Sequence, residues 1–126
     1  MKIKILGLLT VFLLSSVSHA AKPEIWWAIR VDCNVFMEYL SIHLEQKGSI
    51  DSNGIKSYVG SGYDNFDSLD FDSCRTLDAD SISCTGKSNF GTNLKLTVAR
   101  HKDGTFGSLF QRNGASPIKM GCLLTR

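Results

Sequence analysis

Short runs of alternating apolar residues, separated by clusters of Gly, Asn, Asp and Ser, restrict the fold of this chain more than any other feature. The separators read "KGSIDSNG", "GSGYDN", "GKSNFGTN", "KDG" and "NGASP". A period of two indicates strands with one buried face, and such separators are typical of turns between antiparallel neighbours. Strands are therefore expected near residues 24–33, 36–45, 55–60, 68–74, 80–86, 93–101, 105–112 and 117–124.

About eight short strands predict an all-β fold, either a small antiparallel barrel or a sandwich. The segment near 35–47 leaves an alternative open. As a strand it points Phe36 and Leu40 inward, whereas as a helix it is capped by Asn34 and ended by Gly48. A helix there would make the fold α+β, with one helix on an antiparallel sheet.

The clearest hairpin spans residues 93–112, and its register depends on the length of its turn. A two-residue turn would place Val98 and Phe110 on opposite faces. A three-residue loop at 102–104 pairs residues whose numbers sum to 206 and puts both side chains on one face. Burial favours the second register, because a slip of one residue turns every side chain to the other face. Gly104 is then expected at positive φ.

Four cysteines lie beyond the first twenty residues: Cys33, Cys74, Cys84 and Cys122. An even number in an exported chain indicates disulfides rather than free thiols. We expect Cys74–Cys84 to be nested inside Cys33–Cys122. The inner cysteines flank the turn-like "TLDAD", and each outer cysteine lies on the apolar face of its own predicted strand. The spacing does not fit a zinc site, since no C-x-x-C is present.

The N-terminus has the features of a secretory signal peptide. Lys2 and Lys4 precede the apolar run "ILGLLTVFLL", and Ser18 and Ala20 occupy the small-residue positions of a cleavage site. The run is short for the roughly 20 residues that a transmembrane helix needs. We therefore predict a signal peptide at 1–20 and a single exported domain at 21–126, periplasmic or secreted.

Charge is balanced overall but unevenly distributed. Once Lys2 and Lys4 leave with the signal peptide, twelve basic and twelve acidic residues remain. Residues 64–80 hold six aspartates and only Arg75, while residues 87–126 hold seven basic residues and only Asp103. The two segments either face each other or form two poles of the surface. A neutral domain argues against nucleic-acid binding, which favours a basic one.

The acidic segment departs from the pattern of a calcium loop. Asp78 and Asp80 fit its start, but Ile82 and Ser83 occupy the places of its third acidic ligand and its glycine. In "LDFD", alternation places Asp70 and the following aspartate on a solvent face. The sequence thus indicates no metal and no cofactor.

Support for catalysis is limited to two histidines. His43 and His101 are each candidates for a general base, which would need an Asp and a Ser nearby. This gives one functional hypothesis: a small hydrolase acting on an envelope or extracellular polymer. The sequence leaves open whether the protein is an enzyme, and the lack of a catalytic signature favours a non-enzymatic role.

Aromatic residues suggest the other hypothesis, a non-enzymatic binding or inhibitor-like domain. Trp26 and Arg30 are expected on the outer face of the first strand, and Tyr58 and Tyr63 flank a glycine-rich stretch. Trp, Tyr and Arg dominate binding hot spots because they bury a large area with few rotatable bonds. We expect these four residues to form an aromatic loop face that recognises a protein or a glycan.

Overall fold

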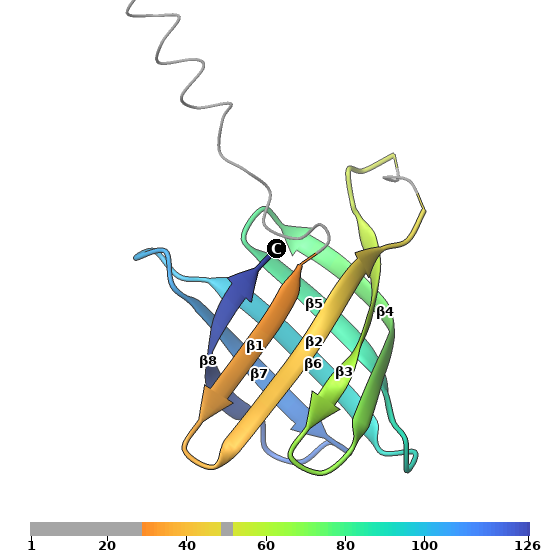
Figure 1. Ribbon diagram of the computed structural model, residues 1–126. Coiled ribbons are helices and arrows are strands. Elements are labelled where there is room, and N and C mark those ends of the chain that lie inside the picture. The colour runs from red at the N-terminus through yellow and green to blue at the C-terminus, as the bar shows by residue number, and fades with distance from the viewer. Residues whose placement is uncertain (1–28, 49–51) are drawn as a thin grey trace, which may run out of the picture.

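The computed structural model describes residues 29–48 and 52–126, which form one closed antiparallel barrel (Figure 1). Each strand pairs with its neighbours in the chain, and the first strand pairs with the last. The strands are β1 (Arg30–Val35), β2 (Glu38–Gln46), β3 (Ser57–Asp64), β4 (Ser68–Asp78), β5 (Ser81–Ser88), β6 (Asn93–Arg100), β7 (Phe106–Arg112) and β8 (Ile118–Thr125).

The segment near 35–47 is a strand, so the helical alternative is wrong. In β2, Leu40, Ile42 and Leu44 are all buried, which is the period of a strand between two partners. The expectation that Phe36 points inward is also wrong. It lies in the turn before β2, and 88% of its surface is exposed.

The core fills the inside of the barrel with alternate side chains from all eight strands. An eight-stranded barrel is just wide enough for side chains to fill it. Ile118, Cys122 and Leu124 of β8 pack against a set of buried residues that share an inward direction: Ile29, Val31, Cys33, Leu40, Ile42, Leu44, Tyr58, Leu69, Phe71, Cys74, Ile82, Cys84, Leu94, Leu96, Val98, Phe110 and Met120.

The β6–β7 hairpin has the three-residue loop and the register predicted for it. Arg100 pairs with Phe106 and Leu96 with Phe110, so each pair sums to 206. Gly104 has φ +89°, a conformation that glycine adopts without a Cβ clash. The observed register is therefore the one that buries Leu96, Val98 and Phe110 on the same face of the hairpin.

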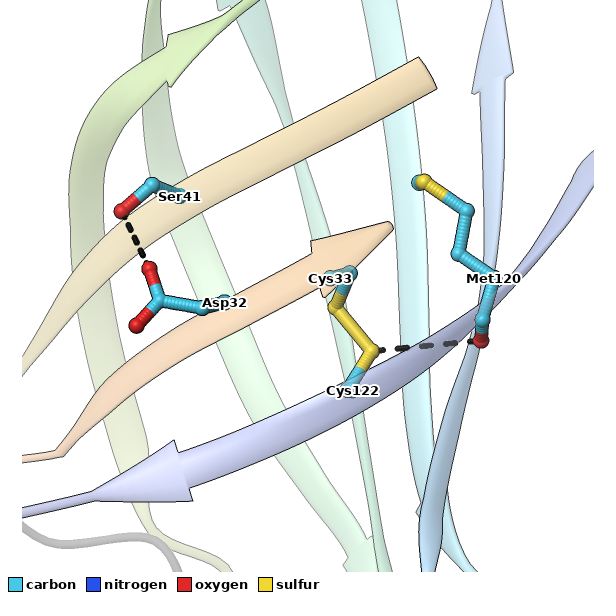
Figure 2. The surroundings of a disulfide bond; sticks show 5 residues. All are labelled: Asp32, Cys33, Ser41, Met120 and Cys122. Carbon is cyan, nitrogen blue, oxygen red and sulfur yellow. Dashed lines mark hydrogen bonds between the residues drawn. A yellow bond between two sulfur atoms is a disulfide. The ribbon is translucent and has the colours of Figure 1, made fainter. Parts of the chain in front are cut away.

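Both predicted disulfides are present, and each joins two directly paired residues of adjacent strands. Cys33–Cys122 links β1 to β8 and closes the barrel covalently, as Figure 2 shows, while Cys74–Cys84 links β4 to β5. The described part of the chain holds no free cysteine. Such bonds persist in an oxidising compartment, which fits an extracellular or periplasmic type of environment.

Ion pairs connect the acidic and basic segments of the sequence, one across the mouth of the barrel and one between neighbouring residues beside β5 and β6. Arg112 of β7 pairs with Asp64 of β3, and Arg100 of β6 pairs with Asp80 in the β4–β5 turn. Two ion pairs thus join residues 64–80 to residues 87–126.

The signal peptide predicted at 1–20 lies outside the described residues and stays a prediction. In the described part of the chain, no helix has the length and apolar character to cross a membrane.

Candidate functional site

The four turns at one end of the barrel carry a set of exposed apolar side chains. This end, which we call the turn end, is formed by residues 36–37, 65–67, 89–92 and 113–117 and lies at the bottom of Figure 1. Phe36, Met37, Phe66 and Phe90 project from three of these turns, with exposed fractions of 88%, 80%, 73% and 82%. Large apolar side chains at turn tips contribute nothing to the core, so the fold does not explain them.

The β1–β2 turn shows that these residue types are not dictated by turn chemistry. Val35 pairs with Glu38, which leaves a two-residue turn of Phe36 and Met37. Met37 has φ +63°, a left-handed conformation usually taken by Gly, Asn or Asp. A bulky residue in such a conformation costs on the order of 1 kcal/mol, and such outliers cluster at functional sites.

Side chains of Asn and Asp tie neighbouring turns to one another. Asn65 accepts a hydrogen bond from the Tyr39 amide (2.7 Å) and donates one to the Met37 carbonyl (2.8 Å). Asp67 accepts from the Phe90 amide at 3.0 Å. Asn113 accepts from the Asn93 amide at 2.9 Å, so three lateral links hold the four turns in fixed relative positions.

Arg112 occupies the centre of this arrangement. Its guanidinium donates to Asp64 Oδ2 from Nε (3.1 Å) and from Nη2 (2.7 Å), and Nη2 lies 3.5 Å from Glu38. Its Cζ atom lies 5.2 Å from the ring centroid of Phe66 and 4.7 Å from that of Phe110. The cation is thus held between two rings and two carboxylates, and it joins the exposed Phe66 to the barrel core.

Asp64 fixes the β3–β4 turn from beneath. Only 2% of its side chain is exposed, and its Oδ1 accepts the amides of Phe66 (2.8 Å) and Asp67 (2.9 Å). One buried carboxylate therefore sets both the turn conformation and, through Arg112, the position of the Phe66 ring.

Two of the residues singled out in the sequence lie on the outer wall of β1–β3. Tyr63 is 47% exposed and packs edge-on against Tyr39, with ring centroids 6.0 Å apart. Arg30 donates to Asp32 and to the Ser41 hydroxyl, which itself donates to Asp32 at 2.6 Å (Figure 2). The outer wall is therefore aromatic around Tyr63, beside the turn end, and polar around Arg30, toward the opposite end of the barrel.

Tyr58 does not join this surface. Tyr58 was expected to be exposed, but it points into the barrel with 1% of its surface accessible, because strand alternation places it beside Gly60 on the inner face. Its hydroxyl has no hydrogen-bond partner among the described residues, and burial raises the pKa of that hydroxyl. Trp26 lies outside the described residues.

The geometry needed for the hydrolase hypothesis is not found in the described ranges. Neither the imidazole of His43 nor that of His101 is hydrogen-bonded to an Asp or a Ser there; His43 is exposed on β2, and His101 lies over Gly107. Asp103 is bonded to Thr105 instead, and these hydrogen bonds are the main cause that lowers the pKa of Asp103. Within residues 29–48 and 52–126, no group of three or more His, Cys, Asp or Glu is placed to hold a metal ion.

The sequence did contain a signal for the turn end. Two turns read "DNFD" and "SNFG", with a phenylalanine directly after an asparagine where polar turn residues are the rule. No local sequence pattern identified Arg112, because its partner Asp64 lies 48 residues away in the chain.

Comparison with models of protein families, with curated proteins and with solved structures found no match to this chain.

Proposed function

We propose that this protein is a non-enzymatic binding domain that recognises a protein partner through the turn end of its barrel. The observation that carries the proposal is the set of three phenylalanines, Phe36, Phe66 and Phe90, exposed on three neighbouring turns. Grouped apolar side chains on an otherwise well-packed small domain mark an interaction site.

The residue types at the turn end match those of protein interfaces. Aromatic residues, Met and Arg are enriched in interface cores relative to the remaining surface. The turn end and the adjoining wall combine all three types: Phe36, Met37, Tyr39, Tyr63, Phe66, Phe90 and the part-buried Arg112. Of the residues expected on an aromatic face, Tyr63 belongs to this surface, Tyr58 is buried, and Trp26 lies outside the described residues.

The links between turns favour tight binding. Association is opposed by the entropy lost when interface loops become ordered. Asn65, Asp67 and Asn113 already fix the turns that carry the phenylalanines. The turn end is therefore pre-organised, and little further ordering is needed on contact.

The charge around the turn end favours a protein over an anionic membrane or a nucleic acid, both of which attract basic surfaces. Acidic and basic residues balance within three residues of the four turns: Glu38, Asp64, Asp67 and Asp70 against Lys87, Lys95, Arg112 and Lys119. A neutral apolar surface of this kind suits a neutral apolar patch on another protein.

The test is affinity capture with the oxidised domain, residues 21–126, from envelope and secreted fractions. The comparison variant is Phe36→Ser/Phe66→Ser/Phe90→Ser, and the matched control is Leu77→Ser, which removes an exposed apolar residue at the opposite end of the barrel. We expect one protein to be captured by wild type and by the control. Its purified form should bind the triple variant about 100-fold more weakly, if each ring contributes at least about 1 kcal/mol.

Three results would contradict the proposal. Equal capture by the triple variant would exclude the turn end. Capture that survives protease treatment of the fractions would indicate a glycan. Co-sedimentation of the domain with vesicles of phosphatidylethanolamine and phosphatidylglycerol, abolished in the triple variant, would assign the phenylalanines to a membrane surface.

A further inference from the structure

One guanidinium is shared by two carboxylates at the centre of the turn end. Arg112 Nη2 lies 2.7 Å from Asp64 Oδ2 and 3.5 Å from Glu38 Oε2. Both hydrogen bonds of the Arg112 side chain go to Asp64, one from Nε and one from Nη2. Two negative charges therefore face one positive charge, and the Glu38 carboxylate is the less compensated of the two.

The two carboxylates also differ in what else they contact. The Asp64 side chain is 2% exposed, and its second oxygen accepts the amides of Phe66 and Asp67. The Glu38 side chain is 28% exposed, and within residues 29–48 and 52–126 Arg112 is the one cation in salt-bridge contact with it. Of the two carboxylates, Glu38 is therefore the one that a partner can reach.

A partner that contacts the phenylalanines would also cover Glu38. This residue begins β2, directly after the turn formed by Phe36 and Met37, and the guanidinium that it contacts lies 5.2 Å from the ring centroid of Phe66. Contact with these rings removes water from the carboxylate. A charge that loses water without gaining a full partner weakens binding, whereas a cation supplied by the other protein restores the balance.

The aromatic rings favour the same kind of ligand. The face of a phenylalanine ring attracts a cation that lies within about 6 Å of its centroid. The Phe66 ring contacts the guanidinium of Arg112 and still exposes most of its surface. A second guanidinium could stack on an exposed ring and bind the Glu38 carboxylate through two parallel hydrogen bonds, which the ammonium group of lysine does not do. Arginine is therefore the best fit.

A surplus of negative charge at the centre is compatible with the overall neutrality of the turn end. Lys87, Lys95 and Lys119 are exposed residues of β5, β6 and β8, and strand alternation places them on the outer wall rather than at the mouth of the barrel. A partner patch that is neutral as a whole can thus carry a basic side chain at its centre and an acidic one at its edge.

We propose that a basic side chain of the protein partner, best an arginine, binds the Glu38 carboxylate beside Phe36 and Phe66. The inference rests on the proposed function, because it names the chemistry that the partner brings to the same site. It makes a separate prediction about charge, which the phenylalanines alone do not make.

The first test uses short peptides in place of the partner. The ¹⁵N-labelled oxidised domain is titrated with acetyl-Leu-Arg-Leu-amide and with acetyl-Leu-citrulline-Leu-amide, in which a neutral urea replaces the guanidinium. We expect saturable shifts of the Phe36, Met37 and Phe66 amides with the arginine peptide, at millimolar affinity. The citrulline peptide should bind about fivefold more weakly, and the difference should shrink as the salt concentration rises.

Two matched variants assign the preference to one carboxylate. Glu38→Gln keeps the shape of the side chain and removes its charge, so it should bind the two peptides equally. Glu45→Gln makes the same change at an exposed position of the same strand, at the opposite end of the barrel, and should keep the preference. Unchanged melting temperatures would establish that both variants fold.

The second test measures the direction of the charge effect on the captured partner. If the partner supplies a cation, Glu38→Gln leaves that cation uncompensated and should weaken binding at least about tenfold. If the contact is purely apolar, the same variant removes a charge that the contact would bury, and it should bind as tightly as wild type or more tightly.

The inference is overturned if the two peptides bind alike, if neither binds, or if Glu38→Gln keeps full affinity for the partner. Capture that is lost in the triple phenylalanine variant but kept in Glu38→Gln upholds the turn end and rejects the basic side chain. Equal capture by the triple variant rejects the proposed function itself, whichever peptide binds.

Discussion

Arg112, the last residue of β7, reaches across the barrel to Asp64, the last residue of β3, and their charged groups lie 2.7 Å apart. β3 and β7 are separated by three strands on either side, so the pair spans the mouth of the barrel at the turn end. It covers the core there and supports the turn that carries Phe66.

Removal of Arg112 should destabilise the domain strongly. Arg112→Met leaves the Asp64 carboxylate, 2% exposed, without its cation, and breaking a buried pair in this way costs about 3 kcal/mol or more. Urea denaturation measures the loss. Arg112→Met/Asp64→Asn should recover part of it, and a loss below about 1 kcal/mol in the single variant would show that the pair is not structural.

The two disulfides should differ in their contribution to stability. Cys33–Cys122 spans 89 residues and Cys74–Cys84 spans 10, which corresponds to about 4.6 and about 2.7 kcal/mol in the chain-entropy estimate. Cys33→Ala/Cys122→Ala should therefore unfold at the lower denaturant concentration of the two double variants. The reverse order would mean that packing around the inner bond outweighs loop closure.

Tyr58→Phe should stabilise the domain by about 1 kcal/mol at neutral pH, because it removes a buried hydroxyl without a partner among the described residues. Burial raises the pKa of Tyr58 above its ordinary value of 10.0. Above that pH the unfolded chain loses the proton and the folded chain keeps it, so wild type loses stability as pH rises. The gap between Tyr58→Phe and wild type, measured by urea denaturation at pH 7 and pH 11, should widen; a constant gap would contradict burial as its cause.

Met37→Gly should raise stability by about 1 kcal/mol, since it relieves a left-handed conformation at φ +63°. Thermal unfolding measures the change. The same variant should bind the partner of the turn end more weakly, because the exposed Met37 side chain is lost. A variant that gains stability and keeps full affinity would remove Met37 from the proposed interface.

The sequence predicted the scaffold better than the site, and the reason is physical. Strand alternation, turn glycines and cysteine placement are local signals, so the eight strands, the register around Gly104 and both disulfides followed from them. The choice between barrel and sandwich depends on whether β1 pairs with β8, which no local pattern states.

The site depends on which way each side chain points and on which distant turns lie together, and neither is visible in a local sequence pattern. Tyr58 and Tyr63 looked alike in "YVGSGYDNF", yet strand parity sends one inward and the other outward. Phe36, Phe66 and Phe90 belong to separate turns, and only the up-and-down topology brings alternate turns to the same end.

Because Arg30 pairs with Thr125, the first and last strands of the barrel lie side by side, as any other two neighbouring strands do. A short linker between the two neighbouring ends, with new termini opened in the connection between β2 and β3, would preserve every strand pair. Both new termini would then lie at the end opposite the turns that carry the phenylalanines (Figure 1). The domain could be fused at either terminus to a surface or a second copy with the turns that carry the phenylalanines facing outward, which makes this barrel a candidate scaffold for display of grafted turns.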